Sequence, residues 1–140
     1  MATVRYSPAV MDHFEHPRNV GKLAGADGVG TAGRAADGDV MTIYIRVRDE
    51  RIREISFQCK GCPAAIACGS MTTELAKARG LDHAAQIADE TVAAALGGLP
   101  PEKRHCSNLG PQALANAIWD YVVRSVERQL ARRRRRRRSE

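Results

Sequence analysis

Three of the four cysteines lie close together in the chain, as Cys59, Cys62 and Cys68, and the fourth, Cys106, directly follows His105. Thiolate and imidazole groups are the ligands with which proteins hold zinc, iron and iron–sulfur clusters. Two cysteines separated by two residues also have the spacing of a redox dithiol. The residue types therefore indicate a thiol-rich site, and we expect Cys62 and Cys106 to meet around a metal.

Cys62 is flanked by Gly61 and Pro63, where a predicted strand ends and a predicted helix begins. The free N–H groups and the dipole at a helix N-terminus favour the thiolate form of a cysteine. Thiolate is both the metal ligand and the nucleophile. Cys62 is therefore the strongest candidate for a functional residue.

Cys59 and Cys68 can also be interpreted as core residues. Cys59 has ligand spacing to Cys62, but strand alternation places it on the inward face with Phe57, and cysteine often packs as a small hydrophobic residue. Cys68 shares a helical stripe with Met71, so we expect it in the core. The cysteine pair follows a hairpin instead of lying in a βαβ unit, which argues against a thioredoxin-like motif.

A cysteine-dependent hydrolase or transferase is the enzymatic alternative. It would use Cys62 or Cys106 as nucleophile and His105 as base. Residues adjacent in sequence seldom face each other well enough for this, and no oxyanion-stabilising motif is evident. We therefore predict that the protein is not an enzyme.

Local patterns predict strands in the first half of the chain. A short helix comes first, with Ser7 as N-cap and Pro8 in its first turn, and it stops near Pro17. Alternating hydrophobic and polar residues then predict three strands that form an antiparallel meander, over residues 29–34, 40–48 and 51–59.

Helical periodicity begins after these strands. The predicted helices cover residues 63–79, 81–87 and 89–96, and Asp82 is the predicted cap of the second. The longest helix begins at Pro111 and carries an apolar residue at every fourth position, namely Leu114, Ile118, Val122, Val126 and Leu130. Strands followed by helices are typical of an α+β fold, here with four to six helices.

The net charge of +6 comes from one end of the chain. Residues 132–138 are seven consecutive arginines, and without residues 132–140 the chain has 15 basic and 15 acidic residues. A run of like charges repels itself and is usually disordered. We therefore predict a folded domain over residues 1–131 and a disordered arginine-rich tail over residues 132–140. Nucleic acid is not an expected partner except through this tail.

The sequence also indicates the expected cellular location of the protein. No stretch approaches the roughly 20 apolar residues that span a bilayer, and no secretory signal pattern is evident at the N-terminus. We expect a cytoplasmic protein without a membrane partner. In that compartment cysteines are more often ligands, reactive thiols or core residues than disulfides.

Several short motifs carry a resemblance to a known family. They are Gly38-Asp39-Val40, Gly61-Cys62, Leu99-Pro100-Pro101 and His105-Cys106-Ser107, together with the segment from Asp12 to Gly21. In this order and at these spacings they resemble the IscU/NifU-type iron–sulfur cluster assembly scaffolds, from about Tyr6 to about Arg128. The resemblance implies an α+β fold in which three antiparallel strands pack against helices.

The resemblance also implies a function. In this family a [2Fe–2S] cluster is assembled at an exposed site from iron and from sulfur supplied by a cysteine desulfurase, and is then passed to acceptor proteins. Scaffolds of this kind also carry zinc in place of the cluster. The implied cofactor is therefore iron or a [2Fe–2S] cluster, with zinc as the alternative, and the resemblance leaves a homodimer open.

The resemblance assigns the family's site residues to this chain by their positions in the motifs. Cys62 and Cys106 match the second and third cysteines of the family, and His105 matches its histidine. Asp39 matches an aspartate that modulates the site. The position of the first cysteine holds Asp37, which is the main departure from the family pattern.

A carboxylate is a harder ligand than a thiolate, cannot carry a persulfide and should hold a [2Fe–2S] cluster less tightly. Either Asp37 is itself a ligand, or Cys59 supplies the missing thiolate. We favour Asp37 together with Cys62, His105 and Cys106, with Cys59 as the alternate ligand. The nearest rival function is a zinc-binding regulatory or structural relative that no longer assembles clusters. Against it, closed structural zinc sites normally use three or four cysteines, whereas oxygen and nitrogen ligands make up half of this set.

Some of these scaffolds bind a dedicated Hsp70-type chaperone through a short segment. The matching residues of this chain are Leu99, Pro100, Pro101 and Lys103. Glu102 stands where that segment has a valine, so a charge replaces an apolar contact. We expect such a chaperone as a partner, with weakened binding.

Overall fold

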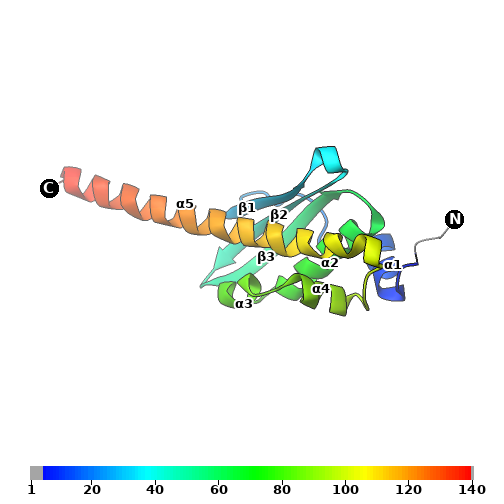
Figure 1. Cartoon of the computed structure of the whole chain (residues 1–140). Coiled ribbons are helices and arrows are strands. Elements are labelled where there is room, and N and C mark those ends of the chain that lie inside the picture. The colour runs from blue at the N-terminus through cyan, green and yellow to red at the C-terminus, as the bar shows by residue number, and fades with distance from the viewer. Residues whose placement is uncertain (1–4, 140) are drawn as a thin grey trace.

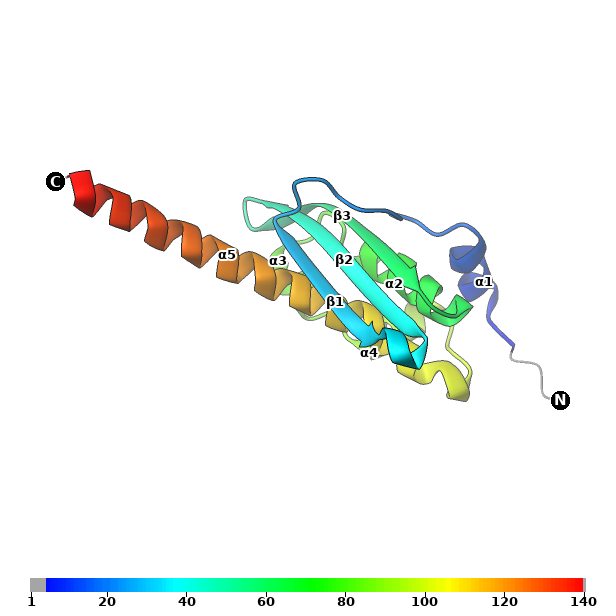
Figure 2. The ribbon, with the colours of Figure 1, turned by 90° about the horizontal axis from the view of Figure 1, so that it is seen from above.

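The computed structural model describes residues 5–139; residues 1–4 and 140, which belong to the predicted domain and tail respectively, lie outside the described part. Three strands form one antiparallel sheet in the order β1 (Gly28–Arg34), β2 (Asp39–Arg48) and β3 (Arg51–Lys60). Helices α5 (Leu109–Ser139) and α2 (Pro63–Ala76) pack against it, α5 on β1 and β2 and α2 on β3 (Figure 2). The predicted α+β meander is confirmed.

The strand register places the predicted inward residues in the core. Ile43 pairs with Phe57 and Ile45 pairs with Ile55, and all four side chains are buried. An irregularity in the pairing near the end of β2 changes the alternation, so that Ile52 is buried as well. One face of the sheet is therefore apolar and is covered by the helices.

Helix α1 (Pro8–Glu15) has the predicted start and end. The Ser7 hydroxyl accepts a hydrogen bond from the Val10 N–H at 3.1 Å, and Pro8 lies in the first turn. The buried side chain of His13 contacts α2, where its Nδ1 lies 2.7 Å from the Ser70 hydroxyl. This contact fixes the N-terminal helix against the domain.

Helix α2 ends at Ala76, earlier than the predicted end before Gly80. Ala78 adopts a left-handed conformation with φ of 63°, and its N–H donates to the Ile52 carbonyl. The Ile52 N–H in turn donates to the Arg79 carbonyl. Hydrogen bonding to the start of β3 therefore replaces the last helical turn that the local pattern predicted.

Three further helical segments connect α2 to α5. Helices α3 (Leu81–Ala85) and α4 (Asp89–Ala95) confirm the two predicted short helices. The cap predicted at Asp82 is wrong, because Gly80 occupies the N-cap of α3 and Asp82 lies in its first turn. The 3₁₀ helix η2 (Pro101–Asn108) was not predicted, and it carries part of the candidate site.

Glycines allow α5 to approach the sheet closely. A Cβ atom at Gly28 or Gly30 in β1 would overlap the backbone of Ala117 in α5. A Cβ at Gly69 in α2 would likewise lie 2.6 Å from the ring of Phe57. Glycine at these positions therefore permits the close approach of α5 to β1 and of α2 to Phe57.

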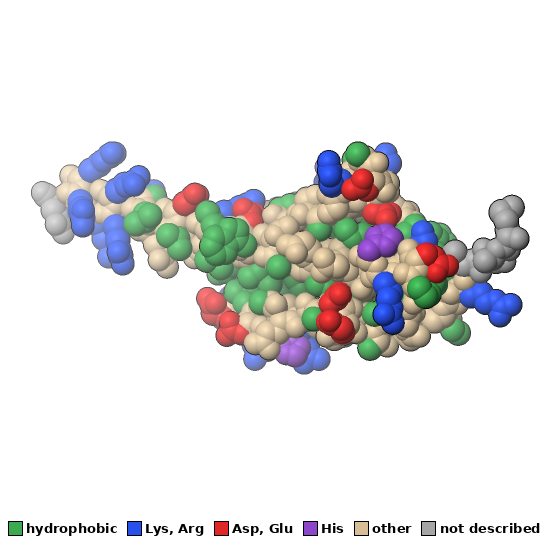
Figure 3. Space-filling model, in the orientation of Figure 1, with side chains coloured by type: hydrophobic (Ala, Val, Ile, Leu, Met, Phe, Trp, Pro, Cys, Tyr) green, Lys and Arg blue, Asp and Glu red, His purple; other side chains and the backbone are tan. Residues whose placement is uncertain are grey.

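Helix α5 projects far beyond the domain (Figure 1). Of its predicted apolar stripe only Leu114 is fully buried, whereas Val122, Val126 and Leu130 are exposed. The helix continues through the seven arginines to Ser139, which differs from the predicted disorder of residues 132–139. Arginine has a high helix propensity, and the helix already formed upstream removes the cost of nucleation. Figure 3 shows the basic side chains gathered at this projecting end. The domain boundary at residue 131 stays a prediction.

Candidate metal centre

Three elements bring the predicted site residues to the end of the domain opposite the projecting part of α5 (Figure 2). Asp39 is the first residue of β2, and Cys62 is the N-cap of α2. His105 and Cys106 lie in η2. Residues distant in sequence therefore meet where a strand begins and a helix begins.

The two sulfur atoms lie at the spacing of ligands to one metal. Cys62 Sγ and Cys106 Sγ are 3.7 Å apart. Two thiolates bound at about 2.3 Å to one tetrahedral ion lie about 3.8 Å from each other. Burial and the neighbouring Cys62 raise the pKa of Cys106 well above its usual range. A bound cation would reverse this effect, since a coordinating thiol is deprotonated.

Asp39 completes a three-ligand group. Its Oδ1 accepts a hydrogen bond from the Cys62 N–H at 3.0 Å. A carboxylate oxygen of Asp39 and the two sulfur atoms all lie within 4.8 Å of one another. A Cβ at Gly61 would overlap Asp39 Oδ1, so a glycine is needed there for this contact. Asp39 was predicted to modulate the site, whereas the geometry places it among the potential ligands.

His105 lies at the edge of this group. Its Nε2 is 3.6 Å from Cys106 Sγ and 4.0 Å from Asp39 Oδ2. We expected residues adjacent in sequence not to face each other, and the turn of η2 overturns this expectation. The His105 side chain is 67% exposed, so it has room to rotate toward a bound ion.

Asp37 lies outside the group formed by Asp39, Cys62 and Cys106. It is the last residue of the 3₁₀ helix η1 (Ala35–Asp37), which connects β1 to β2, and it is exposed. Gly38 follows with φ of 89°, a left-handed conformation that suits glycine. Metal binding by Asp37 stays a prediction.

The other two cysteines differ in their surroundings. Cys59 is half-buried near the site, and burial, Asp39 and Cys62 together raise its pKa to about 12. Its sulfur is not part of the close ligand group. Cys68 is fully buried in the core, as predicted, and burial raises its pKa.

Two residues near the thiols were not assigned to the site from the sequence. The pKa of Lys103 is raised, chiefly by the negative charge that Cys62 can carry. The pKa of Tyr6 is raised chiefly by burial, with Cys62 and Cys106 adding to the effect. Lys103 was noted only for chaperone binding, and no sequence signal marked Tyr6.

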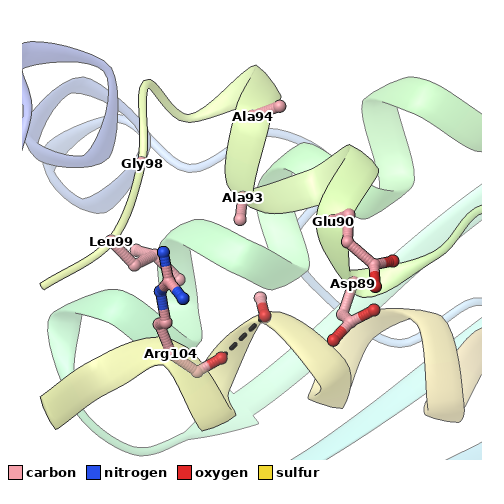
Figure 4. A pocket seen from close by; sticks show the side chains of 8 residues that line it. Asp89, Glu90, Ala93, Ala94, Gly98, Leu99 and Arg104 are labelled. Atoms are coloured by element: carbon pink, nitrogen blue, oxygen red, sulfur yellow. Dashed lines mark hydrogen bonds between the residues drawn. The ribbon is translucent and has the colours of Figure 1, made fainter. Parts of the chain in front are cut away.

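The segment predicted to bind a chaperone borders a hollow of about 450 Å³. Leu99 and Arg104 line it on one side, and Asp89 and Glu90 of α4 line it on the other (Figure 4). The Ser107 hydroxyl donates to the Arg104 carbonyl at 2.7 Å and holds this turn of η2. The hollow is adjacent to the candidate metal centre but does not include its ligands.

Among the helices described within residues 5–139, none combines the length and the apolar character needed to cross a membrane.

Comparisons with known proteins cover most of the chain. The model of the NifU-like N terminal domain matches residues 5–128. The iron–sulfur cluster assembly scaffold protein IscU 1 of Archaeoglobus fulgidus is 58% identical over 116 residues, which are 83% of this chain and 76% of that protein. The scaffold protein IscU of Aquifex aeolicus is 44% identical over 121 residues, 85% of this chain and 77% of that protein.

Solved structures have the same fold. A hypothetical protein with 25% identity covers 79% of this chain and 93% of its own, with a TM-score of 0.66. A putative iron–sulfur cluster assembly scaffold protein for the SUF system from Fervidobacterium islandicum, 20% identical, covers 81% of this chain and 96% of its own, with a TM-score of 0.68.

Proposed function

Because the chain belongs to the NifU-like N-terminal domain family, we propose that it is an iron–sulfur cluster assembly scaffold or carrier. It would bind iron or a [2Fe–2S] cluster and pass it to acceptor proteins. The observation that carries the proposal is the meeting of Cys62, Cys106 and an aspartate oxygen within 4.8 Å. The names of the relatives, IscU scaffolds at 44–58% identity, support the same function.

The donor set suits a cargo that must be released again. Two thiolates hold iron or zinc firmly, whereas carboxylate oxygen and imidazole are weaker partners for a [2Fe–2S] cluster. His105 would complete the site by rotating toward the ion, because its side chain is largely exposed. Asp37 is proposed as a ligand beside Cys62, His105 and Cys106, with Cys59 as the alternate.

The proposed partners follow from this role. A cysteine desulfurase would supply sulfur, and acceptor proteins would receive the cluster. An Hsp70-type chaperone would bind Leu99, Pro100, Pro101 and Lys103, less tightly because Glu102 introduces a charge. The role requires no turnover of an organic substrate, so the protein would not be an enzyme. A homodimer and a cytoplasmic location remain predictions.

A second candidate function rests on the same geometry. The sulfur separation of 3.7 Å fits zinc as well as iron. A zinc-binding regulatory or structural relative would therefore use the same ligands without assembling clusters. The two functions differ in whether sulfide is ever incorporated.

Metal analysis and UV–visible spectra of anaerobically purified protein distinguish them. We expect visible sulfur-to-iron charge-transfer bands in the wild type after supply of iron and sulfide. Cys62→Ser and Asp39→Ala should lose them, and Asp37→Ala should weaken them. Cys68→Ala, which removes a core thiol, is the matched control. A colourless protein that keeps one zinc after reconstitution would overturn the scaffold proposal in favour of the zinc protein.

A further inference from the structure

The site contains one pair of thiols in contact, Cys62 and Cys106, and Asp37 stands at the position where the family resemblance predicts the first cysteine. A carboxylate can neither carry a sulfane sulfur atom nor attack one, so sulfur chemistry here falls to the cysteines, and within the described residues Cys62 and Cys106 are the two whose sulfur atoms are in contact. We propose that this pair reduces delivered sulfur by itself: Cys106 attacks a persulfide on Cys62, releases sulfide and closes a Cys62–Cys106 disulfide. The inference rests on the proposed function in one respect, the delivery of sulfane sulfur to this site.

Exposure decides which thiol receives the sulfur. Cys62 is partly exposed at the N-cap of α2, whereas Cys106 is fully buried. A donor protein or small persulfide can therefore reach Cys62 first. Cys68 is buried in the core, and in the described chain only Cys62 and Cys106 have sulfur atoms in contact with each other.

The geometry places the Cys106 sulfur close to the Cys62 sulfur that it attacks in the second step. The Cys106 sulfur lies 3.7 Å from the sulfur it must attack, and a disulfide bond is about 2.05 Å long. Closure therefore requires a sulfur movement of about 1.7 Å, which is within reach of a χ1 rotation combined with a small shift of η2. His105 Nε2, 3.6 Å from Cys106 Sγ, is placed to accept the thiol proton.

The atoms and electrons balance in two steps. A donor persulfide, R–S–SH, transfers its outer sulfur to the Cys62 thiol and leaves as R–SH. Cys106 Sγ then bonds to Cys62 Sγ, the bond from Cys62 Sγ to the outer sulfur breaks, and that sulfur leaves with the electron pair as HS⁻. The proton of Cys106 passes to His105. The outer sulfur gains two electrons, and the two cysteine sulfurs supply one each.

The disulfide then excludes metal from the site. Both thiolates that would hold iron are consumed, so an external dithiol must reduce the disulfide before the site can bind metal again. Sulfide release and metal binding therefore alternate at one pair of residues. A scaffold with a third thiolate ligand would not be limited in this way.

The test uses the full-length, metal-free, reduced protein under anaerobic conditions. It is treated with one equivalent of glutathione persulfide, and released sulfide and intact mass are followed over time. The wild type should release close to one equivalent of sulfide and become lighter by two hydrogen atoms, with Cys62 and Cys106 linked in the peptide map. Once the sulfur is on Cys62, the half-time of sulfide release should not depend on protein concentration, because the attack of Cys106 is intramolecular.

Variants separate the two roles. Cys106→Ser should retain the added sulfur on Cys62 and release sulfide at least about tenfold more slowly. Cys62→Ser should take up no sulfur at the buried Cys106. Cys68→Ala should behave as the wild type, which controls for loss of a thiol.

Three results would overturn the inference: a wild type that keeps the added sulfur as long as Cys106→Ser does, a disulfide formed without sulfide, or a persulfide found on Cys106 instead of Cys62. Cluster binding is measured separately and needs no persulfide. A protein that binds a cluster but releases no sulfide contradicts only this inference. A protein that releases sulfide but binds no iron contradicts only the scaffold function.

Discussion

Replacement of Gly61 by alanine should weaken the metal site without changing the identity of any ligand. A Cβ at this position would overlap Asp39 Oδ1 and would lie 3.2 Å from Asp39 Cγ and 3.3 Å from the Ala65 Cβ. The methyl group therefore displaces the carboxylate and breaks its hydrogen bond to the Cys62 N–H. Gly61 does not have a positive φ, so alanine itself introduces no backbone strain.

The size of the effect follows from what the carboxylate does. Loss of a group that orients a metal ligand typically lowers affinity about 10–100-fold, or about 1.4–2.7 kcal/mol. The Asp39 side chain is only 18% exposed, so loss of its hydrogen bond should also lower the free energy of unfolding of the metal-free protein by about 1–3 kcal/mol. Zinc affinity measured by competition with a chelator, and denaturant unfolding, give the two quantities.

A double-mutant cycle tests the cause. If Gly61→Ala acts through the carboxylate, then Gly61→Ala combined with Asp39→Ala should bind zinc as Asp39→Ala does, within about 0.5 kcal/mol. Additive losses in the double variant, or wild-type affinity in Gly61→Ala alone, would refute the reasoning.

Four further predictions concern other parts of the molecule. Asp37→Cys should restore a third thiolate and slow loss of the cluster to a chelator about tenfold or more, and an unchanged loss rate would remove Asp37 from the site. Gly30→Ala should lower the free energy of unfolding by about 1–3 kcal/mol in denaturant titrations, because its Cβ overlaps the α5 backbone, whereas Thr31→Ala, at an exposed neighbouring position, should change it little. The pKa of Cys59 is raised from 9.0 to about 12 in the folded state, so its contribution to stability is present below pH 9 and is lost as the pH rises from 9 toward 12. Cys59→Ala should remove that part of the pH dependence, and an identical alkaline profile would contradict it. Deletion of residues 132–140 should abolish any salt-sensitive binding to DNA in a mobility-shift assay, and binding retained by the truncated chain would place the contact in the domain.

Local sequence signals were sufficient for most of the elements. Ser7 and Pro8 determined where α1 begins, and alternation from Val40 onward predicted both long strands. Such signals depend on backbone preferences and on periodicity within a few residues, so they can be recognised in the sequence without knowledge of the tertiary fold. The same holds for Cys62, whose flanking glycine and proline mark the turn between strand and helix.

Contacts between distant segments determined the features that local patterns did not predict, namely the end of α2 and the arrangement of the site. Helix α2 stops at Ala76 because residues 78 and 79 bond to the start of β3, and no local pattern encodes that partner. Asp39 joins the potential ligands because Gly61 lets its carboxylate reach the Cys62 N–H across 23 residues of chain. The sequence by itself predicted Cys62, His105 and Cys106 as residues that could do chemistry at this site. Only the tertiary structure decided that two sulfurs and Asp39 meet while Asp37 stands apart, because those distances depend on how η1, η2 and α2 pack at one end of the sheet.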